Sequence, residues 1–140
     1  MSWRCRIPLL CLAVLAAALG CGKGATPPSD TGSAGAARDY GEAVCQRDWP
    51  RAYTLLHPDS RRRFSADQFT RLAANYRQGI GFEPEKVHLR AHEERGDEAI
   101  IHLNFTGLAG GKRKFYKESL QLRRDGTQWL VVLPPRFGQR

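Results

Sequence analysis

The 140-residue sequence lacks a hydrophobic run long enough to cross a membrane as a helix. Its longest apolar stretch spans residues 7–19, contains Pro8, and falls short of the roughly 20 residues that a spanning helix needs. Residues 1–6 carry two arginines and no acid, which is typical of the positively charged start of a secretory signal. We therefore predict a signal peptide over residues 1–20, ending at the small residue Gly20, and an exported protein.

Cysteine is scarce, with four residues in the whole chain. Cys5 and Cys11 belong to the predicted signal peptide, so only Cys21 and Cys45 remain after cleavage. The run Ala17-Ala18-Leu19-Gly20-Cys21 resembles the bacterial lipobox, in which a peptidase cuts before a cysteine that carries diacylglycerol. The resemblance implies lipid attachment at Cys21. It leaves Cys45 alone, so we expect no intrachain disulfide and a small buried thiol at Cys45.

The lipobox resemblance also implies a destination. Ala18 and Leu19 depart from the commonest form of the motif, and the alternative is an ordinary secretory signal with a chance cysteine. Gly22 stands where Asp would resemble an inner-membrane retention signal. We therefore expect an anchored protein of the cell envelope, at the periplasmic face of the outer membrane rather than at the inner membrane. Two acyl chains would make that attachment stable.

Several motifs of enzymes are missing as well. The sequence has no Gly-rich phosphate loop, no Ser-His-Asp-like arrangement and no cysteine pair with the spacing of a metal site. We therefore expect neither a cofactor nor a metal, and a protein that is not an enzyme.

Acidic residues are outnumbered by basic ones. The net charge of +8 falls to +6 once Arg4 and Arg6 leave with the signal peptide. Basic clusters at residues 61–63, 112–114 and 123–124 either contact anionic lipids and wall polymers or are simply solvated. Nucleic acid is not an expected partner, because the protein is exported and no aromatic stacking platform lies among these charges.

Residues 22–37 contain Gly, Ala, Ser, Thr and Pro without a large apolar residue, which predicts a flexible linker. Helical spacing of apolar residues then predicts a short helix from Arg38, and a second helix that Asp48 caps and that ends near residues 57–59. Residues 60–64 are interpreted as a basic turn. Ser65 and Gln68 form a capping box that predicts a third helix, ended by Gly79 or Gly81.

After Pro84 the hydrophobic period changes from 3.6 to 2, which predicts four strands around residues 87–92, 101–105, 116–122 and 129–133. Glycine-containing turns near residues 96, 110 and 126 make the strands an antiparallel meander. For the first hairpin we predict a three-residue loop over residues 96–98, because a two-residue loop would mix apolar and polar faces. That register pairs Ala91 with Leu103.

Three further runs of the sequence carry a resemblance to a known family. They are Arg47-Asp48-Trp49-Pro50-Arg51-Ala52-Tyr53-Thr54-Leu55-Leu56, Phe64-Ser65-Ala66-Asp67-Gln68-Phe69 and the late strand Gly126-Thr127-Gln128-Trp129-Leu130-Val131. Together they resemble nuclear-transport-factor-2-like domains. The resemblance implies an α+β domain over residues 38–137, in which about three helices cover a curved four-stranded antiparallel sheet. It also implies a cone shape with an apolar pocket between sheet and helices. Some such domains are isomerases or dehydratases, whereas many only bind ligands or dimerise.

An isomerase-like site needs a carboxylate base and a phenol in one dry pocket. Tyr53, Tyr76 and Tyr116 supply phenols, although their regular spacing is typical of core positions. We expect no acid at an apolar-face strand position, the nearest being Glu93, which the predicted register pairs with Ile101.

Three histidines lie in the first two predicted strands. The predicted register places His92 opposite His102, with His88 on the same polar face, where the three could hold a metal. The interpretation that we prefer is a solvated polar face, because Arg90 lies among them and a cation disfavours a metal.

The sequence therefore favours a lipid-anchored envelope protein with a non-catalytic binding or interaction module. The alternatives are a small pocket enzyme acting on an apolar ligand and an electrostatic tether to anionic envelope polymers. The expected partners are the membrane through Cys21, an envelope protein or anionic polymer, and a second copy in a homodimer.

Overall fold

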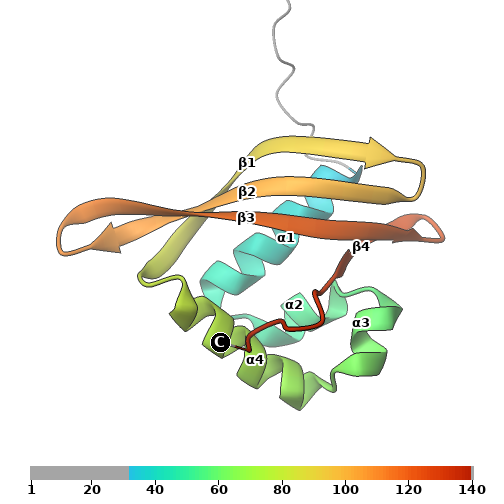
Figure 1. Ribbon diagram of the computed structural model, residues 1–140, viewed down its shortest axis with the longest axis horizontal. Helices are drawn as coiled ribbons and strands as arrows, with labels where there is room; N and C mark the ends of the chain where they lie inside the picture. The colour runs from blue at the N-terminus through green and yellow to red at the C-terminus, as the bar shows by residue number, and fades with distance from the viewer. Residues whose placement is uncertain (1–31, 140) are drawn as a thin grey trace, which may run out of the picture.

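The computed structural model describes residues 32–139, and these form four helices followed by four strands (Figure 1). The predicted signal peptide, Cys21 and residues 22–31 of the predicted linker lie outside the described residues. No helix in the described part of the chain has both the length and the apolar character to cross a membrane. The expected α+β class, with helices before strands, is confirmed.

Helix α1, Gly32–Gln46, begins six residues before the predicted start at Arg38. Ala34, Ala37 and Val44 are buried along one face, and Gly41 packs so closely on Val87 that a Cβ would lie 2.8 Å from a methyl group. Small residues thus let the helix lie close against the sheet. The prediction of a linker over residues 32–37 is wrong, because Gly, Ala and Ser serve there as close-packing residues.

Two short helices follow. Helix α2, Trp49–Thr54, is capped as predicted by Asp48, whose carboxylate accepts the backbone N–H of Arg51 at 3.1 Å. Helix α3, Pro58–Arg63, replaces the predicted basic turn, so there are four described helices where about three were expected. Pro58 was expected only to end the preceding helix. It also occupies the first turn of α3, where a missing N–H costs nothing.

Helix α4, Ala66–Gly79, has the predicted capping box. Ser65 Oγ accepts the backbone N–H of Gln68 at 3.3 Å, and the Gln68 side chain accepts the Ser65 N–H at 2.9 Å. Gly81 follows the helix with a positive φ of 83°. Both predicted ends are confirmed, because the signals that set them are local in sequence.

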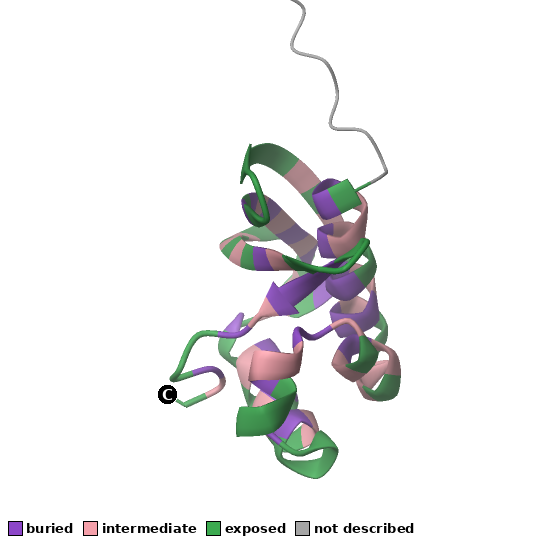
Figure 2. Ribbon diagram, turned by 90° about the vertical axis from the view of Figure 1, so that its right-hand side faces the viewer, coloured by how far each residue is buried: buried purple, intermediate pink, exposed green. Residues whose placement is uncertain are grey.

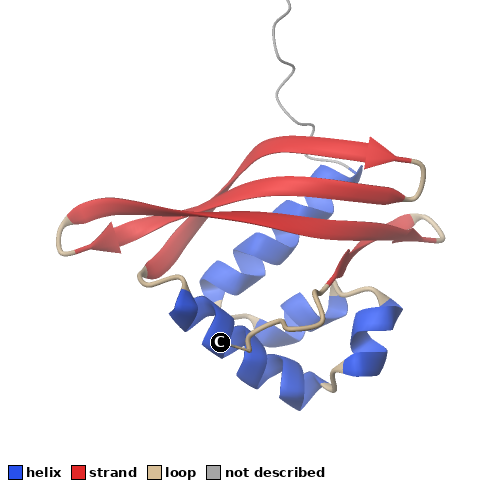
Figure 3. Ribbon diagram, viewed as in Figure 1, coloured by secondary structure: helices blue, strands red, loops and turns tan. Residues whose placement is uncertain are grey.

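The sheet is an antiparallel meander in the order β1-β2-β3-β4, as predicted (Figure 3). Its strands are β1 Glu83–Arg95, β2 Glu98–Ala109, β3 Lys112–Asp125 and β4 Gln128–Val132. The helices cover one face of the sheet, here called the inner face, and the other is the outer face. Figure 2 shows the buried residues gathered between the two layers. Ile101, Leu103 and Phe105 of β2 lie there with Val44 and Phe69 of the helices.

The register predicted for the first hairpin is wrong. Its loop has two residues, with Arg95 paired to Glu98, and Ala91 pairs with His102 rather than Leu103. A bulge between Leu89 and Ala91 then shifts the register, so that Leu89 pairs with Leu103 on the inner face. The bulge removes the mixing of faces that argued against a two-residue loop.

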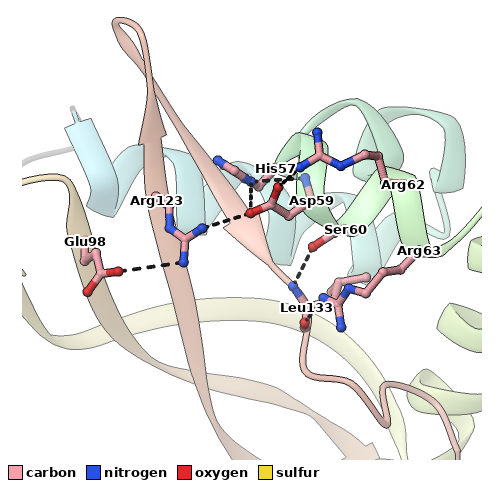
Figure 4. A network of polar contacts seen from close by, with 8 residues as sticks. All are labelled: His57, Asp59, Ser60, Arg62, Arg63, Glu98, Arg123 and Leu133. Carbon is pink, nitrogen blue, oxygen red and sulfur yellow. Dashed lines mark hydrogen bonds and ion pairs between the residues drawn. The ribbon is translucent and has the colours of Figure 1, made fainter.

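Strand β4 pairs only with residues 121–125 of β3, so residues 112–120 of β3 have an open edge among the described residues. The chain beyond β4 is fixed instead by helix α3 (Figure 4). Ser60 Oγ accepts the Leu133 N–H at 2.9 Å, and Arg63 donates to the Leu133 carbonyl at 2.5 Å. Arg123 of β3 donates to the Asp59 carboxylate at 2.9 Å.

Candidate functional site

A partly enclosed cavity of about 280 Å³ lies where β4 ends and the C-terminal segment leaves the sheet. Its walls come from α1, β3, β4 and residues 133–137. The lining includes Tyr40, Glu118, Leu120, Val131, Leu133 and Phe137. The walls are mostly apolar with a few polar groups, as in sites that bind small molecules.

Glu118 is the one acidic residue in that lining. It lies on the inner face, opposite Leu103, and shares this face with Tyr116 and Leu120. The expectation that no acid occupies an apolar-face strand position is therefore wrong. In the sequence, Glu118 alternates with Tyr116, Leu120 and Leu122, and this period of two was enough to place Glu118 on the inner face. Its charge argued against that position.

Glu118 is held by two hydrogen bonds. The Tyr76 hydroxyl of α4 donates to Oε2 at 2.7 Å, and the backbone N–H of Ser119 donates to Oε1 at 2.8 Å. Phe137 packs against the Tyr76 ring, with centroids 5.2 Å apart. Burial, and then the charge and hydrogen bond of Glu118, raise the pKa of Tyr76 far above the ordinary range, so this phenol stays protonated and acts as a donor.

Tyr40 of α1 is the phenol in the cavity lining. Its side chain is almost completely buried, with 1% of its surface exposed, and its hydroxyl has no hydrogen-bond partner among the described residues. Burial, with a smaller contribution from Glu118, raises the pKa of Tyr40 as well. A buried hydroxyl without a partner is costly. The oxygen is itself covered by neighbouring atoms, so a molecule in the cavity would reach it only after a small shift of the side chains around it.

None of the predicted phenols Tyr53, Tyr76 and Tyr116 belongs to the cavity lining. Tyr53 donates its hydroxyl to the Phe64 carbonyl at 3.1 Å and fixes the turn between α3 and α4. Tyr116 is half-buried opposite Phe105. Glu93 is exposed and pairs with Ile100 on the outer face, not with Ile101. Of the named phenols, the structure therefore brings only Tyr76 to a carboxylate at the cavity.

The three histidines do not converge. His92 pairs with Ile101 on the inner face, whereas His102 pairs with Ala91 on the outer face, so the predicted opposition of the two is wrong. His102 Nδ1 lies 2.8 Å from Ser119 Oγ, and His88 Nε2 lies 3.3 Å from Thr106 Oγ1. No group of metal-binding side chains occurs among residues 32–139. The bulge in β1 separates the histidines.

The cysteine and the basic clusters fall outside the cavity. Cys45 is half-buried, and burial raises the pKa of its thiol to about 11. Residues 61–63 lie in helix α3, residues 112–114 begin β3 after the turn at Gly110 and Gly111, and residues 123–124 end β3. The clusters at residues 61–63 and 123–124 are partly neutralised, because Arg62 and Arg123 both contact Asp59.

Comparisons with known proteins identify the fold. No family model matches the sequence, and no curated protein matches it. The chain is similar to a crystal structure from Campylobacter jejuni, provisionally named an NTF2-like transpeptidase, with 14% identity and a TM-score of 0.58 over 74% of this chain and 100% of that chain. It is also similar to a SEC-C motif containing protein from Rhodopseudomonas palustris, with 16% identity and a TM-score of 0.48 over 65% of this chain and 67% of that chain. The first likeness supports a nuclear-transport-factor-2-like fold for the described domain.

Proposed function

We propose that the domain is a non-catalytic binding module that holds a small amphiphilic molecule in the cavity beside Tyr40 and Glu118. The observation that carries this proposal is the Tyr40 side chain, which lines the cavity and whose buried hydroxyl has no partner among the described residues. A ligand that accepts a hydrogen bond from this hydroxyl would remove the cost of leaving it unpaired. The cavity thus offers a ligand polar recognition as well as apolar contact.

The lining defines the chemical class of the ligand. Leu120, Val131 and Phe137 suit an apolar body, while Tyr40 can donate a hydrogen bond and Glu118 can accept one. An alcohol can satisfy both polar groups at once, because its hydroxyl donates one hydrogen bond and accepts another. We therefore propose a small alcohol on an apolar body as the ligand class.

Two features favour binding over catalysis. Each carboxylate oxygen of Glu118 already accepts one hydrogen bond, which leaves room for a further bond from a ligand, whereas taking up a substrate proton would disturb the bonds already made. The raised pKa values of Tyr40 and Tyr76 keep both phenols protonated, which suits donors and not bases. Transpeptidation, named for the Campylobacter protein, needs an activated nucleophile, and Cys45 at a pKa of about 11 is a poor one.

Paired probes test the binding proposal. Benzyl alcohol carries the proposed polar group, and toluene has the same ring without it. We expect benzyl alcohol to raise the unfolding temperature of the chain in a concentration-dependent way, and toluene to do so much less. Tyr40→Phe should remove most of the preference for benzyl alcohol. Equal effects of toluene and benzyl alcohol on the wild-type chain would contradict the proposal.

A second function has one observation in its favour. An isomerase-like site needs a carboxylate beside a phenol in a dry pocket, and Glu118 lies beside Tyr76 at the cavity. In this alternative Glu118 removes a proton next to a carbonyl, and Tyr40 donates to the oxygen that becomes negative. Proton exchange of cyclohexenone in D₂O, followed by NMR, distinguishes the two functions. If the wild-type chain accelerates this exchange and Glu118→Gln does not, the enzyme is the correct function and the binding module is not.

We further propose that Cys21 carries the lipid that anchors this module in the cell envelope, with the outer membrane favoured. The support is the lipobox-like run at residues 17–21 and the Gly22 that follows it. Globomycin, or Cys21→Ala, should leave unprocessed or soluble protein. Unchanged membrane fractionation of Cys21→Ala would remove the anchor from the proposal and leave the cavity argument intact.

A further inference from the structure

The turn between β2 and β3 combines exposed apolar side chains with unpaired positive charge. Three large apolar residues are exposed in the described chain, and two of them, Leu108 at 53% and Phe115 at 65%, lie beside this turn. Both belong to the outer face, since Leu108 pairs with Arg113 and Phe115 pairs with Thr106. Diagonal neighbours on paired strands lie within reach of an aromatic side chain, so the two form one small apolar surface.

Four cations lie on the same hairpin. Arg113 and Lys117 share the outer face with the apolar pair, whereas Lys112 and Lys114 lie on the opposite face. All four are exposed, and no acid occurs between residues 106 and 117. None of the four side chains forms an ion pair or a hydrogen bond within residues 32–139. The charge therefore stays available to an external anion, in contrast to Arg62 and Arg123, which share Asp59.

The hairpin is also accessible. Figure 1 shows the turn between β2 and β3 extending past the helices, at the left of the view. Gly110 and Gly111 have positive φ angles of 56° and 72°, so the connection is a tight two-residue turn and not a flexible loop. The side chains of residues 108–117 are therefore presented on a stiff projection.

We propose that this hairpin, residues 106–117, docks on a lipid surface that contains anionic head groups. Phe115 and Leu108 enter the boundary between head groups and acyl chains, and Arg113 and Lys117 on the same face contact the phosphates. Lys112 and Lys114, on the other face of the hairpin, add to the attraction toward the anionic surface. Charge alone would equally suit a soluble polyanion, but a polyanion offers the exposed apolar pair no apolar environment, whereas a bilayer does. The surface is independent of the cavity and of lipid attachment at Cys21.

Hydrogen exchange tests the contact, with the full-length Cys21→Ala chain and vesicles of phosphatidylcholine with or without phosphatidylglycerol. Residues 1–31 are the same in every sample. Exchange is measured at the hairpin amides themselves, so it reports membrane contact of the hairpin and not membrane contact of residues 1–31. We expect amides of residues 108–115 to exchange about ten-fold more slowly on the anionic vesicles than on the neutral ones. The acidic turn at residues 95–98, on the opposite hairpin, serves as the internal reference and should not change.

Two variants separate charge from apolar insertion. The triple variant K112Q/R113Q/K114Q should weaken the hairpin contact with anionic vesicles about a hundred-fold, and so abolish the slowed exchange. L108S/F115S should keep the slowed exchange at low salt and lose it at about 0.5 M salt, where charge attraction is screened. The control R61Q/R71Q/R136Q removes the same charge from exposed positions elsewhere and should keep the protection.

Three results would overturn the proposal. The first is equal protection on neutral and anionic vesicles. The second is the same loss in the R61Q/R71Q/R136Q control as in the hairpin triple variant. The third is protection on anionic vesicles that L108S/F115S matches at both low and high salt, which would leave the apolar pair without a role and assign the hairpin to an anionic polymer instead.

Discussion

Replacing Tyr40 by Phe should stabilise the ligand-free protein. The hydroxyl is buried and has no partner among the described residues, so the substitution removes a desolvated polar group and no known hydrogen bond. A buried hydroxyl without a partner costs about 1–3 kcal/mol. The ring lies against the cavity, so losing one oxygen disturbs little packing. We expect the free energy of unfolding to rise by about 1–2 kcal/mol, and the unfolding temperature by about 5–10 °C.

Tyr53→Phe is the matched control, because it removes the same oxygen from a different environment. The Tyr53 hydroxyl donates to the Phe64 carbonyl at 3.1 Å, so the variant should lose about 1 kcal/mol. The two substitutions therefore predict opposite signs. Urea denaturation followed by tryptophan fluorescence measures both, and an unchanged m-value shows that the unfolding transition remains comparable. Destabilisation of Tyr40→Phe by about 1 kcal/mol or more would refute the reasoning, since the hydroxyl would then have a partner.

Three further predictions concern the stability of the protein at acid pH, the packing of Gly138 near the cavity, and the reactivity of the Cys45 thiol. Hydrogen bonds from Arg77 and Arg47 lower the pKa of Glu83. The stabilising contribution of Glu83 is therefore present above the ordinary carboxyl pKa and is lost as the pH falls through the lowered pKa of the folded protein. Glu83→Gln should reduce the loss of stability at acid pH (the acid limb), measured by urea denaturation. Gly138→Ala places a Cβ 2.2 Å from the Leu72 carbonyl oxygen at a φ of 65°, so it should cost at least about 2 kcal/mol and weaken benzyl alcohol binding. Cys45, with its pKa near 11, should react with iodoacetamide at pH 8 about a hundred-fold more slowly than in denaturant, measured by mass spectrometry of its peptide.

Neighbouring positions supply controls for the first two of these. Glu85 is exposed on the same strand, and Glu85→Gln should leave the acid limb unchanged. Gly126 has a similar φ of 61°, but a Cβ added there would meet no atom within 4 Å, so Gly126→Ala should cost only about 1 kcal/mol. Equal losses for Gly126→Ala and Gly138→Ala would mean that the contact with Leu72 carries no weight.

The sequence predicted the elements whose signals are local. Asp48 and Ser65 cap their helices by hydrogen bonds to residues three positions away, and both caps are confirmed. The glycine-containing turns at residues 96, 110 and 126 divide the strands as predicted. Helix α3 was missed because Pro58 suits both the end of one helix and the start of the next, and only the tertiary contacts of Ser60 select the second.

The site was harder to predict, because it depends on contacts between distant segments. No particular residue type marks the bulge after Leu89 in the sequence, and because of this bulge His92 and His102 lie on opposite faces of the sheet. Glu118 stood at the correct parity for the inner face, but its charge argued against burial until Tyr76 was known to lie opposite. Nothing in the sequence near Tyr40 says that its hydroxyl ends without a partner.

The open edge of β3 over residues 112–120 has a consequence for the protein at high concentration. An unpaired edge can recruit a strand from another chain, and lysines along it oppose such pairing by repulsion. Lys112, Lys114 and Lys117 lie along this edge, and in a symmetric antiparallel pair they would come close to the lysines of the second copy. The same charges that attract an anionic surface therefore keep one molecule from adding to the sheet of the next, so each lysine is under two constraints at once.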